Sequence, residues 1–540
     1  MRVGRRGFLK SAGAMAAIGA MRPALGELHA NSPAASQLRR MPLLMPDDFS
    51  DLHLTAWRVE PGTPDVNNPL IEGHMPWDSG GVGIHGTVLI DPLDGKWKAY
   101  VVCTPPEETS DGWPRPWVSD NARKRRLCLF ESNDGVHWIR PAFSSLGFGN
   151  YKTTNILFDL AHGVSAYGSV LIDPSNHKWP YEMFVLRERS TEGTPPLNYP
   201  GKMAYYRYHS HDGKGWELFY GPITKPMRED IAFFYRKPDG GYVSYFRVPG
   251  AKPPKGQLPT YETGAARSLY RATSLDGNVW TRDESMLVTG DDLDHRDTQY
   301  NELVPHKVEG GYLGMVSVYH PLTQTQDLRL AASRDGSHWW FPDRKPILAN
   351  APLGEYGGGM LWQSHSMIVE NDTLYIYYGA TEGAHRQLSE TQAPSKVIGY
   401  EQTVISEASG LLPFNAALCR SYWQVDRLYA LASSAGGPTI GVATTKSQDL
   451  AGKTLWVDIK TRPAKKNAPP EFGEGQLQVE LLDSEGQPLR DFGREDCQSL
   501  NGDHNALLAR WRGGVKAPAG ARMARFYLKR TFLYGFDFRA

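Results

Sequence analysis

The sequence predicts an all-β protein: a five-bladed β-propeller followed by a C-terminal antiparallel β-sandwich. Three observations support this prediction: a seven-residue motif that recurs four times, a hairpin pattern that recurs five times, and a composition rich in turn formers and aromatic residues. The chain has 540 residues, with 55 Gly, 39 Pro, 15 Trp and 26 Tyr. This length is greater than a single compact core accommodates, and it indicates more than one domain.

The motif S-x-D-G-x-x-W ends the third strand of four predicted blades. Asp-Gly supplies a tight turn in which Gly takes a positive φ, and the Trp caps the edge of the unit. Successive Trp residues are about 60 to 80 positions apart, which is the length of one four-stranded blade with its loops. The four copies are Ser132–Trp138, Ser210–Trp216, Ser274–Trp280 and Ser333–Trp339.

Five strand–turn–strand segments interleave with the motif and set the number of blades. Each has a polar Asp, Asn or Gly turn between two apolar, β-rich runs. The fifth segment lacks the motif, so we expect its last strands to come from 397–434, with 52–59 as a possible strand that closes the ring. The alternative is an array of two-sheet sandwiches. The segments begin at Gly86, Gly168, Ile231, Glu302 and Ser364.

We expect three parts along the chain. Residues 1–30 are an export signal, residues 45–435 the propeller and residues 436–540 the sandwich. The signal is predicted from the twin-arginine sequence Gly4–Lys10 and the short apolar stretch after it, which imply folding before export and a periplasmic or secreted protein. The sandwich either binds sugar or braces the propeller, and bracing is the simpler interpretation.

Charge and hydropathy exclude several kinds of partner. The formal net charge is zero, with no long basic run, so no nucleic acid partner is expected. After the signal no hydrophobic segment is long enough to span a membrane. Aromatic residues make up 11% of the chain, which suits stacking on sugar rings, although Trp also fills cores. We therefore expect a carbohydrate partner, and the oligomeric state stays open.

The four cysteines, Cys103, Cys128, Cys419 and Cys497, allow three full pairings. No CxxC occurs, so a zinc or redox site is not expected. Cys103 and Cys128 fall in one predicted blade, either as neighbours or as two separate buried thiols.

Ionisable residues recur where each inner strand of the propeller begins. Inner strands converge on a central channel, so we expect these side chains to meet there. The candidate catalytic residues are Asp78, Asp159, Asp230, Asp297 and Glu302. The candidate substrate-binding residues are His85, His162, His295, Arg296, Trp362 and His365.

Glycosidic cleavage needs one carboxylic acid to protonate the leaving oxygen and one carboxylate to attack or to activate water, about 5–5.5 Å apart for retention and about 6.5–9.5 Å for inversion. We expect Asp159 to be the base or nucleophile, with Asp78 as its competitor, and Asp230 to orient the sugar. Glu302 or Asp297 is the acid. The alternative for each is a turn or capping group at a strand end. The motif acids Asp134, Asp212, Asp276 and Asp335 are explained by their turns alone.

With these repeats, residues 45–540 resemble the five-bladed clan of glycoside hydrolase families 32, 43 and 68. The chain lacks a WMNDPNG segment, an RDP motif and a Glu-Cys pair, so the catalytic residues of family 32 do not carry over. The resemblance implies a glycoside hydrolase that needs no cofactor, with a possible structural Ca²⁺ in the channel.

The predicted function is therefore hydrolysis of an oligo- or polysaccharide. One alternative is a non-catalytic propeller that binds glycans. A second is a sialidase- or lyase-like enzyme, and a sialidase needs three Arg around a carboxylate where only Arg228 and Arg296 lie at inner-strand starts.

Overall fold

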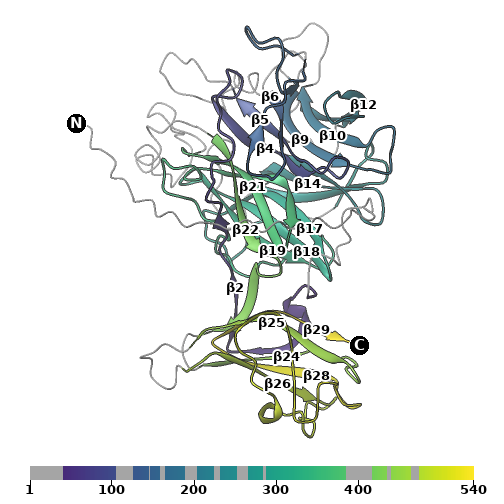
Figure 1. Cartoon of the computed structure of the whole chain (residues 1–540), viewed down its shortest axis with the longest axis vertical. Helices are drawn as coiled ribbons and strands as arrows, with labels where there is room; N and C mark the ends of the chain where they lie inside the picture. Colours follow the sequence, from purple (N-terminus) through teal and green to yellow (C-terminus); the bar gives the residue numbers. More distant parts are fainter. Residues whose placement is uncertain are drawn as a thin grey trace, which may run out of the picture.

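The chain folds into two β-sheet bodies, a larger one of five sheets and a smaller one of two (Figure 1). This is a computed structural model, and it describes residues 41–104, 126–144, 146–158, 164–188, 203–223, 231–251, 266–283, 287–384, 416–434, 439–463 and 473–540. The predicted all-β class is confirmed, and the five-sheet body is the propeller. Within the described segments, no helix has the length and apolar character needed to cross a bilayer.

Each blade is an antiparallel sheet whose first strand is innermost. Blade one has β4 (Gly81–Ile90), β5 (Trp97–Thr104), β6 (Arg126–Ser132) and β7 (Trp138–Ile139), with β8 (Ile156–Phe158) beside β6. Blade two has β9 (Val164–Ile172), β10 (Tyr181–Glu188), β11 (Met203–Ser210) and β12 (Glu217–Ile223). Blade three has β13 (Ala232–Arg236), β14 (Tyr242–Ala251), β15 (Ala266–Ser274) and β16 (Thr281–Arg282).

Blade four has three described strands, β17 (Gln299–Val308), β18 (Gly311–His320) and β19 (Thr325–Ser333). Blade five has β20 (Leu361–Glu370), β21 (Thr373–Thr381), β22 (Ala416–Gln424) and β3 (Thr63–Pro64). A middle strand of a blade is covered on both faces by the neighbouring blades, and all eight residues of β5 are accordingly buried.

The ring is closed by β3, which supplies the outer strand of blade five. Thr63 pairs with Tyr422 and Pro64 with Ser421. The expectation that 52–59 closes the ring is wrong, because those residues pair elsewhere. A strand from the beginning of the chain thus completes the last blade, and it leaves no open seam between the first and last repeats.

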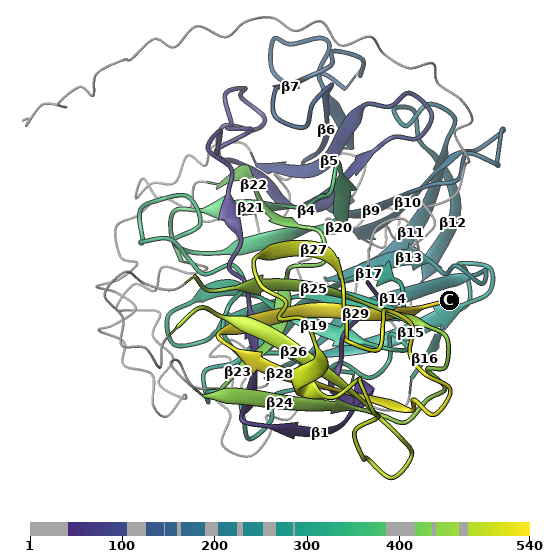
Figure 2. The same ribbon diagram turned by 60° about the horizontal axis from the view of Figure 1, so that its bottom comes forward.

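The smaller body is a sandwich built from both ends of the described chain (Figure 2). One sheet has the order β1 (Phe49–His53), β24 (Ile440–Thr445), β28 (Met523–Lys529) and β26 (Gln476–Leu482). The other has the order β2 (Thr55–Val59), β23 (Tyr429–Ser433), β29 (Thr531–Arg539), β25 (Thr454–Thr461) and β27 (Asp503–Leu508). The range 45–435 expected for the propeller therefore contains three strands, β1, β2 and β23, that pair in the sandwich sheets.

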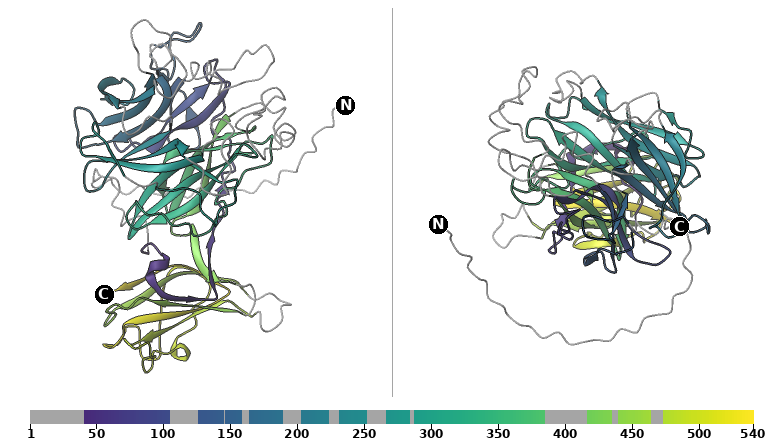
Figure 3. Two further views of the ribbon diagram at one scale, coloured as in Figure 1. Left: turned by 180° about the vertical axis from the view of Figure 1, so that it is seen from behind. Right: turned by 90° about the horizontal axis from the view of Figure 1, so that it is seen from above.

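The two bodies meet at a narrow waist (Figure 3). An aromatic cluster lies there: the Trp57 ring is 4.8 Å from that of Trp340 and 6.0 Å from that of Tyr429, measured between centroids. The Tyr429 hydroxyl donates to the Leu44 carbonyl. The indole N–H of Trp423, in blade five, donates to the Glu60 carbonyl at 2.9 Å. These contacts join the sandwich to the propeller, and the role of the sandwich stays a prediction.

The S-x-D-G-x-x-W motif forms the same turn in all four copies. In the first, the Gly135 N–H donates to Ser132 Oγ at 3.0 Å, and Asp134 Oδ1 accepts the N–H groups of Val136 and His137, both at 2.8 Å. In the third copy, the N–H groups of the two residues that follow the glycine hold the pKa of Asp276 below its ordinary value. The motif acids therefore serve the turns, as the sequence indicated.

Each of these turns also packs on the preceding blade. The Tyr377 hydroxyl of blade five donates to the Gly135 carbonyl at 2.8 Å, and that of Tyr245 in blade three donates to Gly336 at 3.0 Å. A Cβ added at Gly213 would lie 2.6 Å from the Tyr100 hydroxyl of blade one. The glycine is thus required by its positive φ and by the close approach of the neighbouring blade.

All four cysteines are buried as free thiols. Burial and the neighbouring Cys128 thiol raise the pKa of Cys103, so these two cysteines are neighbours within blade one.

We expect Gly213→Ala to destabilise the protein more than Gly95→Ala. Both glycines have φ +73°, but nothing lies within 4 Å of a Cβ at Gly95. Gly95→Ala should therefore lower the free energy of unfolding by about 1–2 kcal/mol, the cost of placing an L-residue at positive φ. Gly213→Ala carries the same cost and a further loss of about 1–3 kcal/mol, because the new Cβ overpacks against Tyr100. Urea unfolding of both variants measures the difference, and equal losses would contradict the proposed fit between blades.

Candidate functional site

The inner strands β4, β9, β13, β17 and β20 surround the propeller axis, each in contact with the next. Side chains join neighbouring strands. The Val170 N–H donates to Thr87 Oγ1 at 3.1 Å between blades two and one, and the Phe234 N–H donates to Ser169 Oγ at 3.2 Å between blades three and two. The ring of blades is therefore held by hydrogen bonds at its centre as well as by apolar packing.

Two contacts cross the axis between blades that are not neighbours. His85 Nδ1 of blade one lies 3.0 Å from Glu302 Oε1 of blade four. Ser169 Oγ of blade two lies 2.8 Å from His365 Nδ1 of blade five. His85 and Glu302 have fully buried side chains. The predicted convergence of inner-strand groups on the axis is thus observed for these residues.

Glu302 is fixed from both of its oxygens. Ser317 Oγ donates to Oε2 at 2.6 Å and in turn accepts Gln363 Nε2 at 2.9 Å, while His85 lies against Oε1. The β17–β18 register shifts between Tyr300 and Glu302, so a bulge aims the carboxylate inward.

His85 reaches the axis through an unusual backbone conformation. Its φ is +63°, within a shift of register between β4 and β5. Its ring lies 4.4 Å from that of Trp362, tilted by 60°. A non-glycine residue in this region of φ is uncommon and marks a constrained position.

His365 lies in an apolar setting. Its ring centroid is 3.8 Å from that of Phe233, and burial together with the nearby His85 lowers the pKa of His365 well below its usual value. The imidazole is therefore neutral: it forms a hydrogen bond with Ser169 and adds no charge at the axis.

These contacts do not fit a calcium site. Ca²⁺ takes six to eight oxygen ligands, whereas the described axial residues offer one carboxylate, and both of its oxygens have partners. Across the described part of the chain, no three His, Cys, Asp or Glu side chains are grouped closely enough to hold a metal ion. The suggested Ca²⁺ in the channel stays a prediction that these residues do not support.

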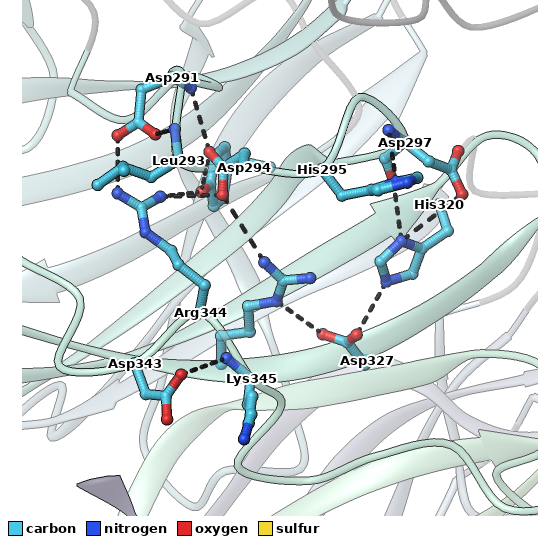
Figure 4. Close-up of polar contacts among 12 residues, drawn as sticks. Asp291, Leu293, Asp294, His295, Asp297, His320, Asp327, Asp343, Arg344 and Lys345 are labelled. Atoms are coloured by element: carbon cyan, nitrogen blue, oxygen red, sulfur yellow. Dashed lines mark hydrogen bonds and ion pairs between the residues drawn. The ribbon is translucent and has the colours of Figure 1, made fainter. Parts of the chain in front are cut away.

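A second polar cluster lies where β17 begins (Figure 4). Asp297 precedes the strand by two residues and is 6% exposed. Its Oδ1 accepts the Leu322 N–H at 2.8 Å, and its Oδ2 lies 3.9 Å from His320 Nδ1. The neighbouring His295 and Arg296 are exposed, so Asp297 is a buried carboxyl group next to exposed residues, two positions before an inner strand begins.

Burial raises the pKa of Asp297 above its ordinary value. This effect outweighs the Leu322 N–H and the nearby basic side chains, which act in the opposite direction. Burial thus favours the protonated form of the Asp297 carboxyl group.

His320 links Asp297 to the third strand of the blade. Its Nδ1 lies 2.8 Å from the Asp297 carbonyl oxygen, and its Nε2 lies 2.8 Å from Asp327 Oδ2. Arg329 Nε lies 3.4 Å from the other oxygen of Asp327. Carboxylates and cations therefore alternate along this chain of contacts (Figure 4).

The loop before Asp297 is anchored to the connection that follows blade four. Arg344 Nη1 lies 2.9 Å from Asp294 Oδ1, and its Nη2 lies 2.7 Å from Asp291 Oδ2 (Figure 4). The Tyr300 hydroxyl donates to the other oxygen of Asp294 at 2.8 Å. Because these bonds fix residues 291–294, the position of Asp297 is constrained from both sides.

The remaining predicted residues fall into two groups. Asp78 caps a turn: its Oδ1 accepts the N–H groups of His74 and Met75 at 2.8 and 2.7 Å, and its Oδ2 lies 2.7 Å from Arg140 Nε. These contacts match the capping alternative. Asp159, His162 and Asp230 lie outside the described residues, so their roles stay predictions.

The sequence interpretation missed the residues that hold these groups in place. Ser317, His320 and Asp327 belong to the second and third strands of blade four, away from the inner-strand starts where the polar residues recur in the sequence. The available signal was a polar side chain within an otherwise apolar, buried strand, as at Ser317. That signal identifies a buried polar group but does not name its partner.

Comparisons with known proteins give fold-level likeness only. No family model and no curated protein matches the chain. A β-1,2-mannobiose phosphorylase from Listeria innocua is 15% identical over 68% of this chain and 98% of its own, with a TM-score of 0.41. A glycosyl hydrolase from Bacteroides ovatus is 12% identical over 72% of this chain and 98% of its own, with a TM-score of 0.39.

A structure of the GH130 family of mannoside phosphorylases and hydrolases is 13% identical, over 71% of this chain and 97% of its own, with a TM-score of 0.39. At these identities and TM-scores the likeness assigns no activity to this chain. The names of these three structures do not include families 32, 43 or 68, so the resemblance of this chain to those families stays a prediction.

We expect His85 and Glu302 to be strongly coupled in stability. Replacing either by Ala leaves a buried polar partner and should cost about 3–5 kcal/mol, while the double variant loses less than the sum. A double-mutant cycle by urea unfolding measures the coupling. The control pair is Lys96 and Glu131, whose Nζ and Oε2 atoms lie 3.3 Å apart. Because the Lys96 side chain is 44% exposed, a coupling energy of about 0.5 kcal/mol is expected for this pair. Additive losses at the axis would contradict the contact.

Proposed function

We propose that this protein is a glycoside hydrolase in which Asp297 is the general acid. One observation carries the proposal: a buried carboxyl group with a raised pKa lies at the start of an inner propeller strand, directly beneath exposed polar residues. Cleavage of a glycosidic bond requires a carboxylic acid that remains protonated near neutrality, and burial is the usual means of keeping it so.

The surroundings favour Asp297 over Glu302 for this role. Glu302 is fully buried at the axis, with Ser317 Oγ 2.6 Å from its Oε2 and His85 Nδ1 3.0 Å from its Oε1. Asp297 lies next to exposed residues: among the described residues, its Oδ1 accepts the Leu322 N–H and its Oδ2 lies 3.9 Å from His320 Nδ1. A sugar oxygen at the end of the channel would reach Asp297 without breaking the contacts that cross the axis.

The second carboxylate of the proposed pair comes from another blade. Asp159 is proposed as base or nucleophile and Asp230 as the group that orients the sugar. Both flank inner-strand starts in the sequence, as Asp297 does. Side chains from different blades at the mouth of a channel are able to span either of the separations used by glycosidases. The twin-arginine sequence of residues 1–30 supports export of the folded enzyme to the periplasm.

A non-catalytic glycan-binding propeller is the second candidate. It is favoured by the axial cluster, where Glu302 is the one carboxylate among the described axial side chains and contacts Ser317 and His85. A binding protein needs hydrogen-bonding groups and aromatic faces but no pair of acids. A sialidase is less favoured: Arg296 is exposed and Arg228 lies outside the described residues.

We expect Asp297→Asn to reduce glycoside hydrolysis about 10²–10⁴-fold, because the amide cannot donate a proton to the leaving oxygen. The assay is hydrolysis of 4-nitrophenyl glycosides and of plant and microbial polysaccharides by the full-length protein. Asp159→Asn is expected to show a loss of similar size.

The matched control is Asp292→Asn, a change at an exposed carboxylate five residues away, which should leave the rate unchanged. Binding of a glycan without hydrolysis by the wild-type protein would establish the second candidate instead. Hydrolysis that survives Asp297→Asn would remove Asp297 from the mechanism.

A further inference from the structure

We propose that His320, acting as an imidazolium ion, is the residue that positions Asp297. It does so by donating one hydrogen bond to the Asp297 backbone and one to Asp327. The functional meaning of this inference rests on the proposed role of Asp297, whereas the contact itself is testable without any activity.

The imidazole ring of His320 has two partners. Nδ1 lies 2.8 Å from the Asp297 carbonyl oxygen, and Nε2 lies 2.8 Å from a carboxylate oxygen of Asp327. Both partners only accept hydrogen bonds. A neutral imidazole carries one N–H and satisfies one of them, whereas the imidazolium carries two and satisfies both. The geometry therefore requires the protonated ring.

The charges that face His320 favour the same state. Asp327 on β19 and Asp297 before β17 lie within 2.8 and 3.9 Å of the ring nitrogens, while Arg329 on β19 is the cation that opposes them. Burial alone would lower the pKa of His320, but the two carboxylates outweigh burial and Arg329, and the pKa is raised.

The raised pKa of His320 makes its contribution to stability depend on pH. Because the folded-state pKa lies above the unfolded value, this contribution is complete at pH values below about 6.5. It is lost as the pH rises through the folded-state value. On deprotonation one of the two bonds must break, and the Asp327 bond, which joins the ring to a carboxylate, is the stronger. The bond to Asp297 is the one released.

The consequence for the site is local. Asp297 sits between two anchors, the Arg344 contacts at residues 291–294 and the His320 contact at its own carbonyl. Without the second anchor, the turn keeps its fixed beginning but loses the constraint at Asp297. The Leu322 N–H bond to the carboxylate is then strained or lost as well. His320 is thus a positioning residue that makes the placement of Asp297 depend on pH.

Hydrogen exchange of the full-length protein at pH 6.0 and 8.5 tests this inference, after correction for intrinsic exchange rates. In the wild type, peptides covering 291–299 and 320–324 should lose about tenfold in protection between the two pH values. His320→Gln should show the lower protection at both pH values, because Gln cannot donate to two acceptors from one position. Asp327→Asn keeps a hydrogen-bond acceptor but removes the negative charge. The pH at which protection is lost should therefore fall by about one unit.

The control is His338→Gln. His338 forms an exposed ion pair with Asp335 at 2.8 Å in the motif turn of the same blade, and its removal should leave both peptides unchanged. Equal protection of the wild type at the two pH values, or an Asp327→Asn profile that coincides with that of the wild type, would overturn the inference. If His320→Gln fails to fold, the Asp327→Asn profile decides alone. Failure of the proposed function is a separate result, since it shows in the hydrolysis assay with Asp297→Asn and not in exchange.

Discussion

The structure depends on one repeated interaction, the docking of an Asp-Gly turn onto the preceding blade. The turn is rigid because Ser and Asp side chains saturate its backbone N–H groups, as at Ser132 and Asp134. The glycine that follows has a positive φ and lies against a tyrosine or arginine of the neighbouring blade, and at Gly135 and Gly213 a Cβ would lie 2.5 and 2.6 Å from the tyrosine hydroxyl. Four such contacts set the angle between blades, and β3 completes the fifth blade from the other end of the chain.

This ring determines what is found at the centre. Five inner strands that start at the same end must bring their side chains together, and the space at the axis is small. Here the axis is closed by two contacts between opposite blades, His85 with Glu302 and Ser169 with His365. These contacts offset part of the cost of burying polar groups there, which is several kcal/mol for a group without a partner.

Two buried carboxyl groups lie near the start of β17. Glu302 lies at the axis, where Ser317 donates to its Oε2 and His85 Nδ1 lies 3.0 Å from its Oε1. Asp297 lies next to exposed residues, and burial raises its pKa above the ordinary value although the Leu322 N–H, which donates to its carboxylate, acts in the opposite direction. Acid catalysis requires a carboxyl group that keeps its proton, and burial is the usual means of providing one.

Local patterns in the amino-acid sequence specify the repeating part of this architecture, whereas the pairing of distant segments is set by the tertiary fold. The seven-residue motif contains nearly all the hydrogen bonds of its own turn, so four copies identify the blades, and five hairpins identify their number. The recurrence of polar residues at inner-strand starts likewise predicted that groups such as His85 and Glu302 would converge on the axis, since that follows from radial repetition. The sequence offered 52–59 as the strand that closes the ring, yet these residues join the sandwich, and 63–64, which no sequence pattern marked, close the propeller. The sequence also did not distinguish Asp297 from Glu302, and it did not reveal His320. The physical reason is that a partner far along the chain, or on the next strand, is chosen by the closure of the ring and the packing of the blades, which no local pattern records.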